Sequence, residues 1–267
     1  MTAAAIDALR NEQSRALTLF DSLTPEEWRA ASGCTGWRVQ DVVQHMASTF
    51  HTIADPASIE GGTSADAEEN AEVPVRARRE WAAVDVMTEY AEWSQRGIDA
   101  LAAMQGPPLG DTVIPLGNLG NHPMHILANA IVFDHYCHLR HDLGAIVERA
   151  AALPRDTAAL EATVEWMLAG LPQMCAQTLA TCDTAVNLRF TDLDGAVFAL
   201  RPGPDGWTVT PGSDVASDVA SDAAFETVST TAHDFVNWGT KRADWRRCGV
   251  TASNSAAART LDAINVI

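Results

Sequence analysis

The amino-acid sequence predicts an α+β protein in two parts: a helical first part, then a part in which helices pack on a small antiparallel sheet. Two observations lead to this prediction. Through most of the first 150 residues, apolar side chains recur every three or four positions, as on amphipathic helices. From about residue 186 they alternate at every second position, in short segments separated by Asp-Gly pairs, as in hairpins. We therefore expect domains at 1–150 and 151–267.

The first domain is expected to hold four helices and one long loop. Residues 38–53 show the clearest helical pattern, with apolar side chains at positions i, i+3, i+4 and i+7. Thr24, Pro25 and Glu27 are typical of a helix start with a capping box. The acidic, aperiodic stretch 54–75 predicts a loop. The helices are expected at 3–20, 38–53, 76–104 and 121–143, and together they predict a four-helix bundle.

The second domain is expected to contain a three-stranded antiparallel meander. Its strands are VNLRF, AVFAL and WTVTP, and the turns between them contain Asp194-Gly195 and Asp205-Gly206. The tandem repeat SDVASDVASD at 213–222 is interpreted as a strand entry or a loop. Helices are expected at 158–181, 231–240 and 253–263.

The overall composition excludes several functional classes. The net charge of −17 argues against nucleic-acid binding, which depends on Lys and Arg contacts to phosphate. No apolar run is long enough to cross a membrane, and the N-terminus lacks the pattern of a signal peptide, so we expect a cytoplasmic protein. The five cysteines are widely scattered, which argues against both a disulfide framework and a cysteine-based zinc site. We expect a monomer or a homodimer.

Five of the eight histidines lie within residues 121–143, on or beside the last expected helix of the first domain. One stripe of this helix begins with apolar Leu127 and Ile131 and continues with Asp134, His138 and His141. Burying such a polar group without a partner costs about a few kcal/mol, and burying a carboxylate costs more. A single histidine on an apolar helix edge is more often a packed or surface residue, but a divalent metal would satisfy this whole set.

A candidate metal site follows from this stripe and an earlier helix. Asp134 and His138 lie one turn apart, and His45 lies at the edge of the apolar face of helix 38–53. Three protein ligands leave a fourth position for water or substrate, as in catalytic zinc sites. Zinc is the expected ion, although imidazole with a carboxylate also suits iron or nickel. The third ligand stays open, with His141 and Asp142 as reserve ligands or as residues that orient a ligand imidazole.

The sequence around His45 resembles a known family. The segment SGCTGWRVQDVVQHM at 32–46 is similar to the helix-entry motif of the mycothiol-dependent maleylpyruvate isomerase branch of the DinB-like superfamily. The matching positions are Cys34, Gly36, Trp37, Val39, Asp41 and His45, and those of a second motif are Asp134, His138, Asp142 and Leu143. The resemblance implies a DinB-like metal-binding four-helix bundle, followed by a C-terminal α+β domain similar to sterol carrier proteins.

The chain departs from this family pattern at two points. The usual acidic ligand is glutamate, whereas Asp134 is shorter by one methylene, and the spacing from His138 to Asp142 is one residue longer than usual. In the second domain, FVNWGTKRADW resembles a family segment whose arginine binds a substrate carboxylate. The resemblance assigns that role to Arg242, with Lys241 and Arg246 as basic neighbours.

The resemblance implies a metal-dependent isomerase that uses mycothiol, a low-molecular-weight thiol, as cosubstrate. Its thiolate would add to a conjugated cis double bond of a small-molecule substrate, and elimination after rotation would give the trans product. Cys34 and Cys137 are interpreted as packing residues. The alternatives are a mycothiol S-transferase that acts on another electrophile or a secondary-metabolite precursor, a non-enzymatic ligand-binding protein with a structural metal, and an interaction module that dimerises through its bundle.

Overall fold

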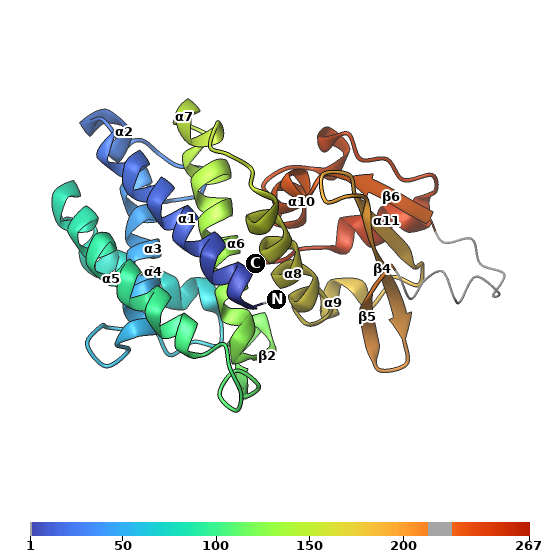
Figure 1. Cartoon of the computed structure of the whole chain (residues 1–267). Coiled ribbons are helices and arrows are strands. Elements are labelled where there is room, and N and C mark those ends of the chain that lie inside the picture. Colours follow the sequence, from blue (N-terminus) through green and yellow to red (C-terminus); the bar gives the residue numbers. More distant parts are fainter. Residues whose placement is uncertain (1, 213–225) are drawn as a thin grey trace. The chain divides into compact units, whose positions relative to one another are not determined.

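A computed structural model describes residues 2–212 and 226–267 (Figure 1). The chain divides into two compact units, Met1–Thr163 and Val164–Ile267, and the division falls within helix α8 (Thr157–Met174). The expected α+β class is confirmed, because the first unit is mainly helical and the second contains a four-stranded sheet. The expected domain boundary at residue 150 and the kinship of the second unit to sterol carriers stay predictions. The repeat at 213–222 lies outside the described residues.

Long helices form the body of the first unit. Helix α3 packs against α5, and α1 packs against both α5 and α6. Helix α3 is held by its apolar stripe, because Val42, Met46 and Phe50 are fully buried. The helices are α1 (Thr2–Asp21), α3 (Val39–Ala54), α5 (Ala83–Ala103) and α6 (Leu127–Cys137).

The expected helix start at Thr24 is confirmed. Helix α2 (Pro25–Arg29) begins with a capping box in which the Thr24 side chain accepts a hydrogen bond from the Glu27 amide. The Glu27 carboxylate accepts one from the Thr24 amide in return. Short elements connect the main helices, namely α7 (Glu148–Ala151) and the 3₁₀ segments Gly117–Leu119 and Met124–Ile126.

Two expectations for the first unit are wrong. The stretch 54–75 is not wholly a loop, because helix α4 (Ala67–Arg78) begins within it, where the Asp66 side chain caps the amides of Glu68 and Glu69. A break at 79–82 then separates α4 from α5, so 76–104 is not one helix. Helix α4 is mostly polar, so its sequence lacks the apolar residues at every third or fourth position that would have predicted a helix.

The expectation of one helix over residues 121–143 is also wrong. Strands β1 (Val113–Pro115) and β2 (Asn121–Pro123) form a hairpin, so α6 starts at Leu127. At its C-terminal end α6 passes into a π-helix, His138–Leu143. In a π-helix the backbone bonds span five residues, and such turns are frequently found at functional sites.

The sheet of the second unit contains the expected meander and one additional strand. Strands β3 (Val186–Phe190), β4 (Ala196–Gly203) and β5 (Gly206–Pro211) pair antiparallel in sequence order. Asp194 and Gly195 both take the left-handed conformation that their turn requires. Strand β6 (Glu226–Thr230) adds in parallel beside β3 and gives the order β5-β4-β3-β6.

Helices cover this sheet. In α10 (Ala232–Gly239), the ring of Phe235 packs 5.3 Å from that of Phe190 in β3, which fixes the helix on one face of the sheet. The other elements of this unit are α9 (Ala176–Leu179), the 3₁₀ segment Trp245–Cys248 and α11 (Ser255–Ala263). Over residues 2–212 and 226–267, the helices are too short or too polar to span a bilayer.

Candidate metal centre

His45 lies on α3, at the edge of the apolar stripe that anchors this helix. Its neighbours Val42 and Met46 are fully buried, whereas the His45 side chain keeps 16% of its surface exposed. The Nε2 atom of His45 lies 2.9 Å from Oδ1 of Asp134 on α6. Two helices that are far apart in the sequence therefore bring an imidazole and a carboxylate into direct contact.

His138 completes this group from the first position of the π-helix. Its Nε2 atom lies 3.4 Å from the same Oδ1 of Asp134. The rings of His45 and His138 stand nearly perpendicular, with their centroids 5.0 Å apart. One potential ligand atom from each residue lies within 4.8 Å of the others. We call His45, Asp134 and His138 the ligand triad.

The ligand triad fits a divalent cation. Two ligand atoms that are each about 2.1 Å from a tetrahedral ion lie roughly 3.4 Å apart, close to the 2.9 and 3.4 Å seen here. Within the described residues, Oδ2 of Asp134 and Nδ1 of His45 are buried without a hydrogen-bond partner. A bound cation would offset the cost of burying this carboxylate. The side chains of His45 and Asp134 keep 16% and 17% of their surface exposed, so the triad is not fully enclosed.

Asp142 fixes the orientation of His138. Its Oδ2 atom lies 2.7 Å from Nδ1 of His138, and its side chain is only 1% exposed. This contact favours the tautomer with the proton on Nδ1 and directs Nε2 towards His45 and Asp134. The spacing from His138 to Asp142 is one residue longer than in the family motif. The π-helix, whose turn is wider than that of an α-helix, spans these two residues.

A second group of ligand-type residues shares His138. Cys34, His138 and Asp142 also bring ligand atoms together, and Sγ of Cys34 lies 3.8 Å from Nδ1 of His138. However, that nitrogen is already engaged by Asp142 at 2.7 Å. The ligand triad uses the opposite nitrogen and includes the buried Oδ2 of Asp134, which lacks a hydrogen-bond partner, so it is the better candidate.

The opposite charges of Asp134 and the two histidines shift the pKa values of Asp134 and His138. Burial raises the pKa of Asp134, but the imidazoles of His45 and His138 outweigh burial and hold that pKa well below its ordinary value. Burial lowers the pKa of His138, yet Asp134 and Asp142 raise it well above the ordinary value. These shifts favour the carboxylate form of Asp134, and metal binding competes with the protonation of His138.

The other predicted residues are not members of the ligand triad. His141 lies on the π-helix with its ring 6.4 Å from that of Tyr136, and it is in neither ligand group of the described residues. Arg242 is an exposed residue of the second unit, directly after Lys241, whose φ of 60° is left-handed. The role of Arg242 stays a prediction.

The remaining neighbours of the triad include one contact that the sequence did not suggest. The ring of Trp37 lies 5.4 Å from that of His45, and its Nε1 donates a hydrogen bond to Glu72 of α4 at 2.7 Å. Glu72 falls in the stretch expected to be a loop, so only the cap at Asp66 could have indicated this helix. His135 is a satisfied core residue, because its two nitrogens contact the Ile131 carbonyl and the Tyr90 hydroxyl.

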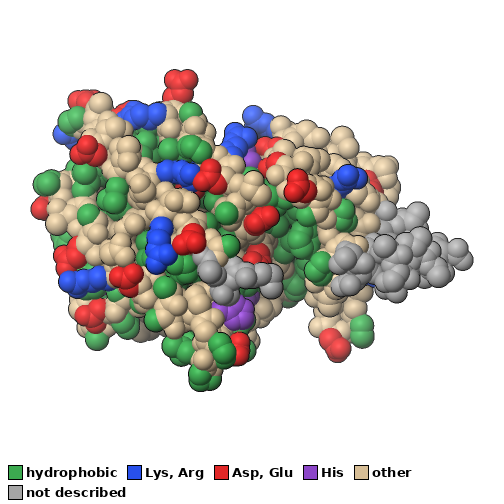
Figure 2. Space-filling model, in the orientation of Figure 1, with side chains coloured by type: hydrophobic (Ala, Val, Ile, Leu, Met, Phe, Trp, Pro, Cys, Tyr) green, Lys and Arg blue, Asp and Glu red, His purple; other side chains and the backbone are tan. Residues whose placement is uncertain are grey.

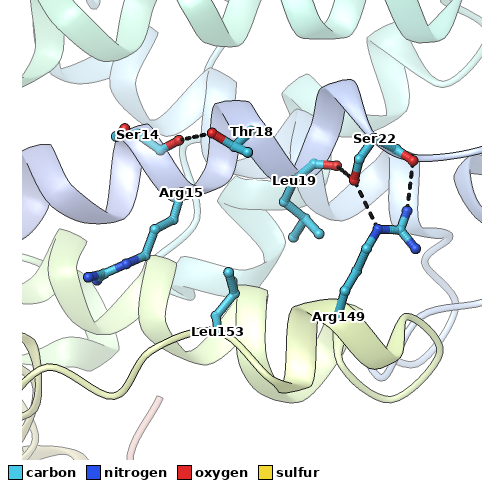
Figure 3. Close-up of a pocket in the computed structure, with 7 residues that line it drawn as sticks. All are labelled: Ser14, Arg15, Thr18, Leu19, Ser22, Arg149 and Leu153. Carbon is cyan, nitrogen blue, oxygen red and sulfur yellow. Dashed lines mark hydrogen bonds between the residues drawn. The ribbon is translucent and has the colours of Figure 1, made fainter.

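A surface cavity of about 410 Å³ lies elsewhere, between α1 and α7 (Figure 3). Its two arginines already bind carboxylates, Arg15 with Asp156 and Arg149 with Glu27. The cavity contains no member of the ligand triad, so we do not assign it to the metal centre. Its lining residues are Ser14, Arg15, Thr18, Leu19, Ser22, Arg149 and Leu153.

Comparisons with known proteins agree with this architecture. Residues 9–114 match the family model of the mycothiol maleylpyruvate isomerase N-terminal domain, a range that includes His45. The chain is similar to a crystal structure of the mycothiol-dependent maleylpyruvate isomerase, with a TM-score of 0.58, 15% identity, and coverage of 95% of this chain and 93% of that chain.

A crystal structure of a histidine-to-alanine mutant of the mycothiol-dependent maleylpyruvate isomerase gives a TM-score of 0.55 at 13% identity, with the same coverage of both chains. No curated protein matches the sequence. At this identity the two structures show a shared fold. Residues 9–114 therefore resemble the mycothiol maleylpyruvate isomerase N-terminal domain, and the chain adopts the fold of the isomerase structures.

Proposed function

We propose that this protein is a metal-dependent enzyme that uses mycothiol to isomerise a cis double bond in a small acid of the maleylpyruvate type. One observation supports this proposal above all. Two imidazoles and a carboxylate converge from α3, α6 and the π-helix, and two of the three side chains are partly exposed. This arrangement lies in a chain whose residues 9–114 match the family model of the mycothiol maleylpyruvate isomerase N-terminal domain.

The residues of the centre divide into ligands and a support. His45, Asp134 and His138 would hold the ion, and the donor set of two nitrogens and one oxygen suits zinc. A divalent metal bound here would supply a positive charge that favours the deprotonated form of a coordinated thiol. Asp142 keeps the Nδ1 proton of His138 in place, so that Nε2 stays available as a ligand.

The proposed reaction leaves the thiol unchanged. The sulfur of mycothiol adds to one carbon of the conjugated cis double bond, and the neighbouring carbon becomes an enolate. The former double bond, now single, rotates. Elimination of the thiolate then restores the double bond in the trans form. We propose Arg242 as the residue that binds a substrate carboxylate, for which a planar guanidinium offers two parallel donors.

The test is an assay of the purified, zinc-loaded protein with maleylpyruvate and mycothiol, in which the trans product and the free thiol are both measured. We expect trans product with no net loss of thiol, and none without mycothiol. Turnover in the absence of thiol would contradict the mechanism. Loss of one thiol per molecule of product would instead indicate an S-transferase. A zinc ion without an exchangeable water, together with no turnover, would favour a ligand-binding protein with a structural metal.

The proposed role of Arg242 has a matched control five residues later in the chain. Arg242→Ala should raise the KM for maleylpyruvate, because a carboxylate contact is lost. Arg247→Ala also removes an exposed arginine but should leave this KM unchanged. Equal effects of the two variants on KM would mean that Arg242 contributes only to general attraction of the anion.

A further inference from the structure

A fully buried ion pair joins α1 to the π-helix of the candidate metal centre. Arg140 donates from Nη1 to Oε2 of Glu12 at 2.7 Å and from Nη2 to Oε1 at 2.9 Å. Both side chains are 0% exposed. Two parallel bonds of this kind fix the orientation of a guanidinium as well as its position.

Arg140 is also held on its other sides. Its Nε donates to the carbonyl of Pro154 at 3.1 Å, and Nη2 contacts the same oxygen. The guanidinium lies 4.1 Å above the ring of Tyr136 on α6. The side chain has therefore little freedom to move, and neither has the backbone that carries it.

This backbone is the one that carries the metal-site residues. Arg140 lies midway between His138 and Asp142 on the π-helix, two residues from each. From the opposite direction, the Gly33 amide donates to the Asp142 carbonyl at 2.9 Å. π-Helical turns are rare because their hydrogen-bond geometry is not favoured on its own, so contacts from outside the turn matter for its shape.

We propose that Glu12 and Arg140 are positioning residues, which hold the π-helix so that His138 presents Nε2 to the ligand triad and Asp142 meets Nδ1. Through this geometry the ion pair sets the metal affinity of the centre. The inference rests on the proposed metal site. A buried ion pair is often no more stabilising than apolar residues of the same volume, so its advantage here is the defined position of the π-helix.

The test uses variants that separate fold stability from geometry. Glu12→Leu combined with Arg140→Met replaces the pair by apolar side chains, and Arg140→Lys keeps the charge but loses the paired bonds. The control is Glu92→Gln, which breaks an exposed ion pair with Arg96 within α5. The zinc dissociation constant is measured by competition with a chelator, and thermal unfolding is followed in the metal-free protein.

We expect the double variant to unfold cooperatively near the wild-type temperature and to bind zinc on the order of 10- to 100-fold more weakly, as when other supports of ligand residues are lost. Arg140→Lys should fall between it and the wild type, and Glu92→Gln should bind zinc as the wild type does. A double variant that folds and keeps the wild-type zinc affinity would overturn the proposal.

A second readout does not depend on the metal. In the metal-free protein, the His138 Nδ1 proton that bonds to Asp142 should give a downfield imidazole resonance in nitrogen-15-labelled protein, which Asp142→Ala should abolish. We expect Arg140→Lys and the double variant to weaken or abolish this resonance. If the wild type binds no zinc but these variants lose the resonance, the proposed function fails and the positioning role holds. Retention of the resonance in both variants would overturn the positioning role.

Discussion

At the scale of single residues, Asp142 lies on the π-helix and orients His138 of the ligand triad. Its carboxylate engages one nitrogen of His138 and leaves the other to face Asp134. A negative charge in this position also makes the imidazole a stronger electron donor to a bound ion.

We therefore predict that Asp142→Asn weakens zinc binding by about 10-fold, because the amide can still accept a hydrogen bond but carries no charge. The dissociation constant measured by chelator competition checks this. Asp41→Asn is the control, since Asp41 is equally buried but binds Arg38 instead of a triad residue. Equal zinc affinities of Asp142→Asn and the wild type would show that Asp142 does not support His138.

Gly33 allows the close approach of its loop to the π-helix. A Cβ atom at this position would lie 2.9 Å from Cα of Asp142, which is too close for any real contact. We predict that Gly33→Ala destabilises the protein by about 1–3 kcal/mol, a typical cost of overpacking, as measured by urea denaturation. Gly61→Ala should be nearly neutral, since nothing lies within 4 Å of its added carbon. A neutral Gly33→Ala would mean that the loop can move away freely.

At the scale of elements, the sequence predicted helices where the apolar period was strong and failed where tertiary contacts decide. Helix α3 was predictable because its buried stripe is continuous. Helix α4 was not, because it buries only a short stretch around Val75 and depends on its cap and on contacts such as Glu72 with Trp37. The change from α6 to a π-helix leaves no signal in the pattern of residue types.

One contact between elements should affect stability as the pH falls. The Arg149 side chain of α7 lowers the pKa of Glu27 on α2 from 4.5 to about 2. A carboxyl whose pKa is depressed by folding stabilises the folded state above its unfolded value, and this contribution disappears as the pH falls through the folded value. Glu27→Gln should therefore lower the unfolding temperature at pH 7, by less at pH 3.5, and by very little at pH 2. A difference that stays constant over this range would argue against the pairing.

At the scale of the whole molecule, the change of period near residue 186 was enough to predict the α+β class. The meander followed from local turn signals, whereas β6 pairs in parallel with a strand some 40 positions earlier in the chain, for which the sequence holds no local cue. Figure 2 shows acidic and basic side chains interspersed over the visible face, although the net charge is −17. Net charge does not define a site, so the function of the protein is argued from the candidate metal centre and not from its surface charge.

For the candidate site, the residue types and their spacing could be taken from the sequence. The contacts between individual ligand atoms come from the structure. Asp134 and His138 were paired by their one-turn spacing, and His45 was added as a metal-ligand type on an early helix. The support from Glu12 could not be foreseen, because it lies 128 residues before Arg140 and resembles any charged residue of an amphipathic helix.

The central claim is that the ligand triad binds a divalent metal, and zinc titration of the metal-free protein tests it most directly. The wild type is predicted to bind a single zinc ion tightly, and His45→Ala, Asp134→Ala and His138→Ala should each lose most of this affinity. His125→Ala should not, because its ring contacts the Gly110 carbonyl instead of the triad. If the three triad variants bind zinc as tightly as the wild type and the His125 variant, the assignment of the metal centre is wrong.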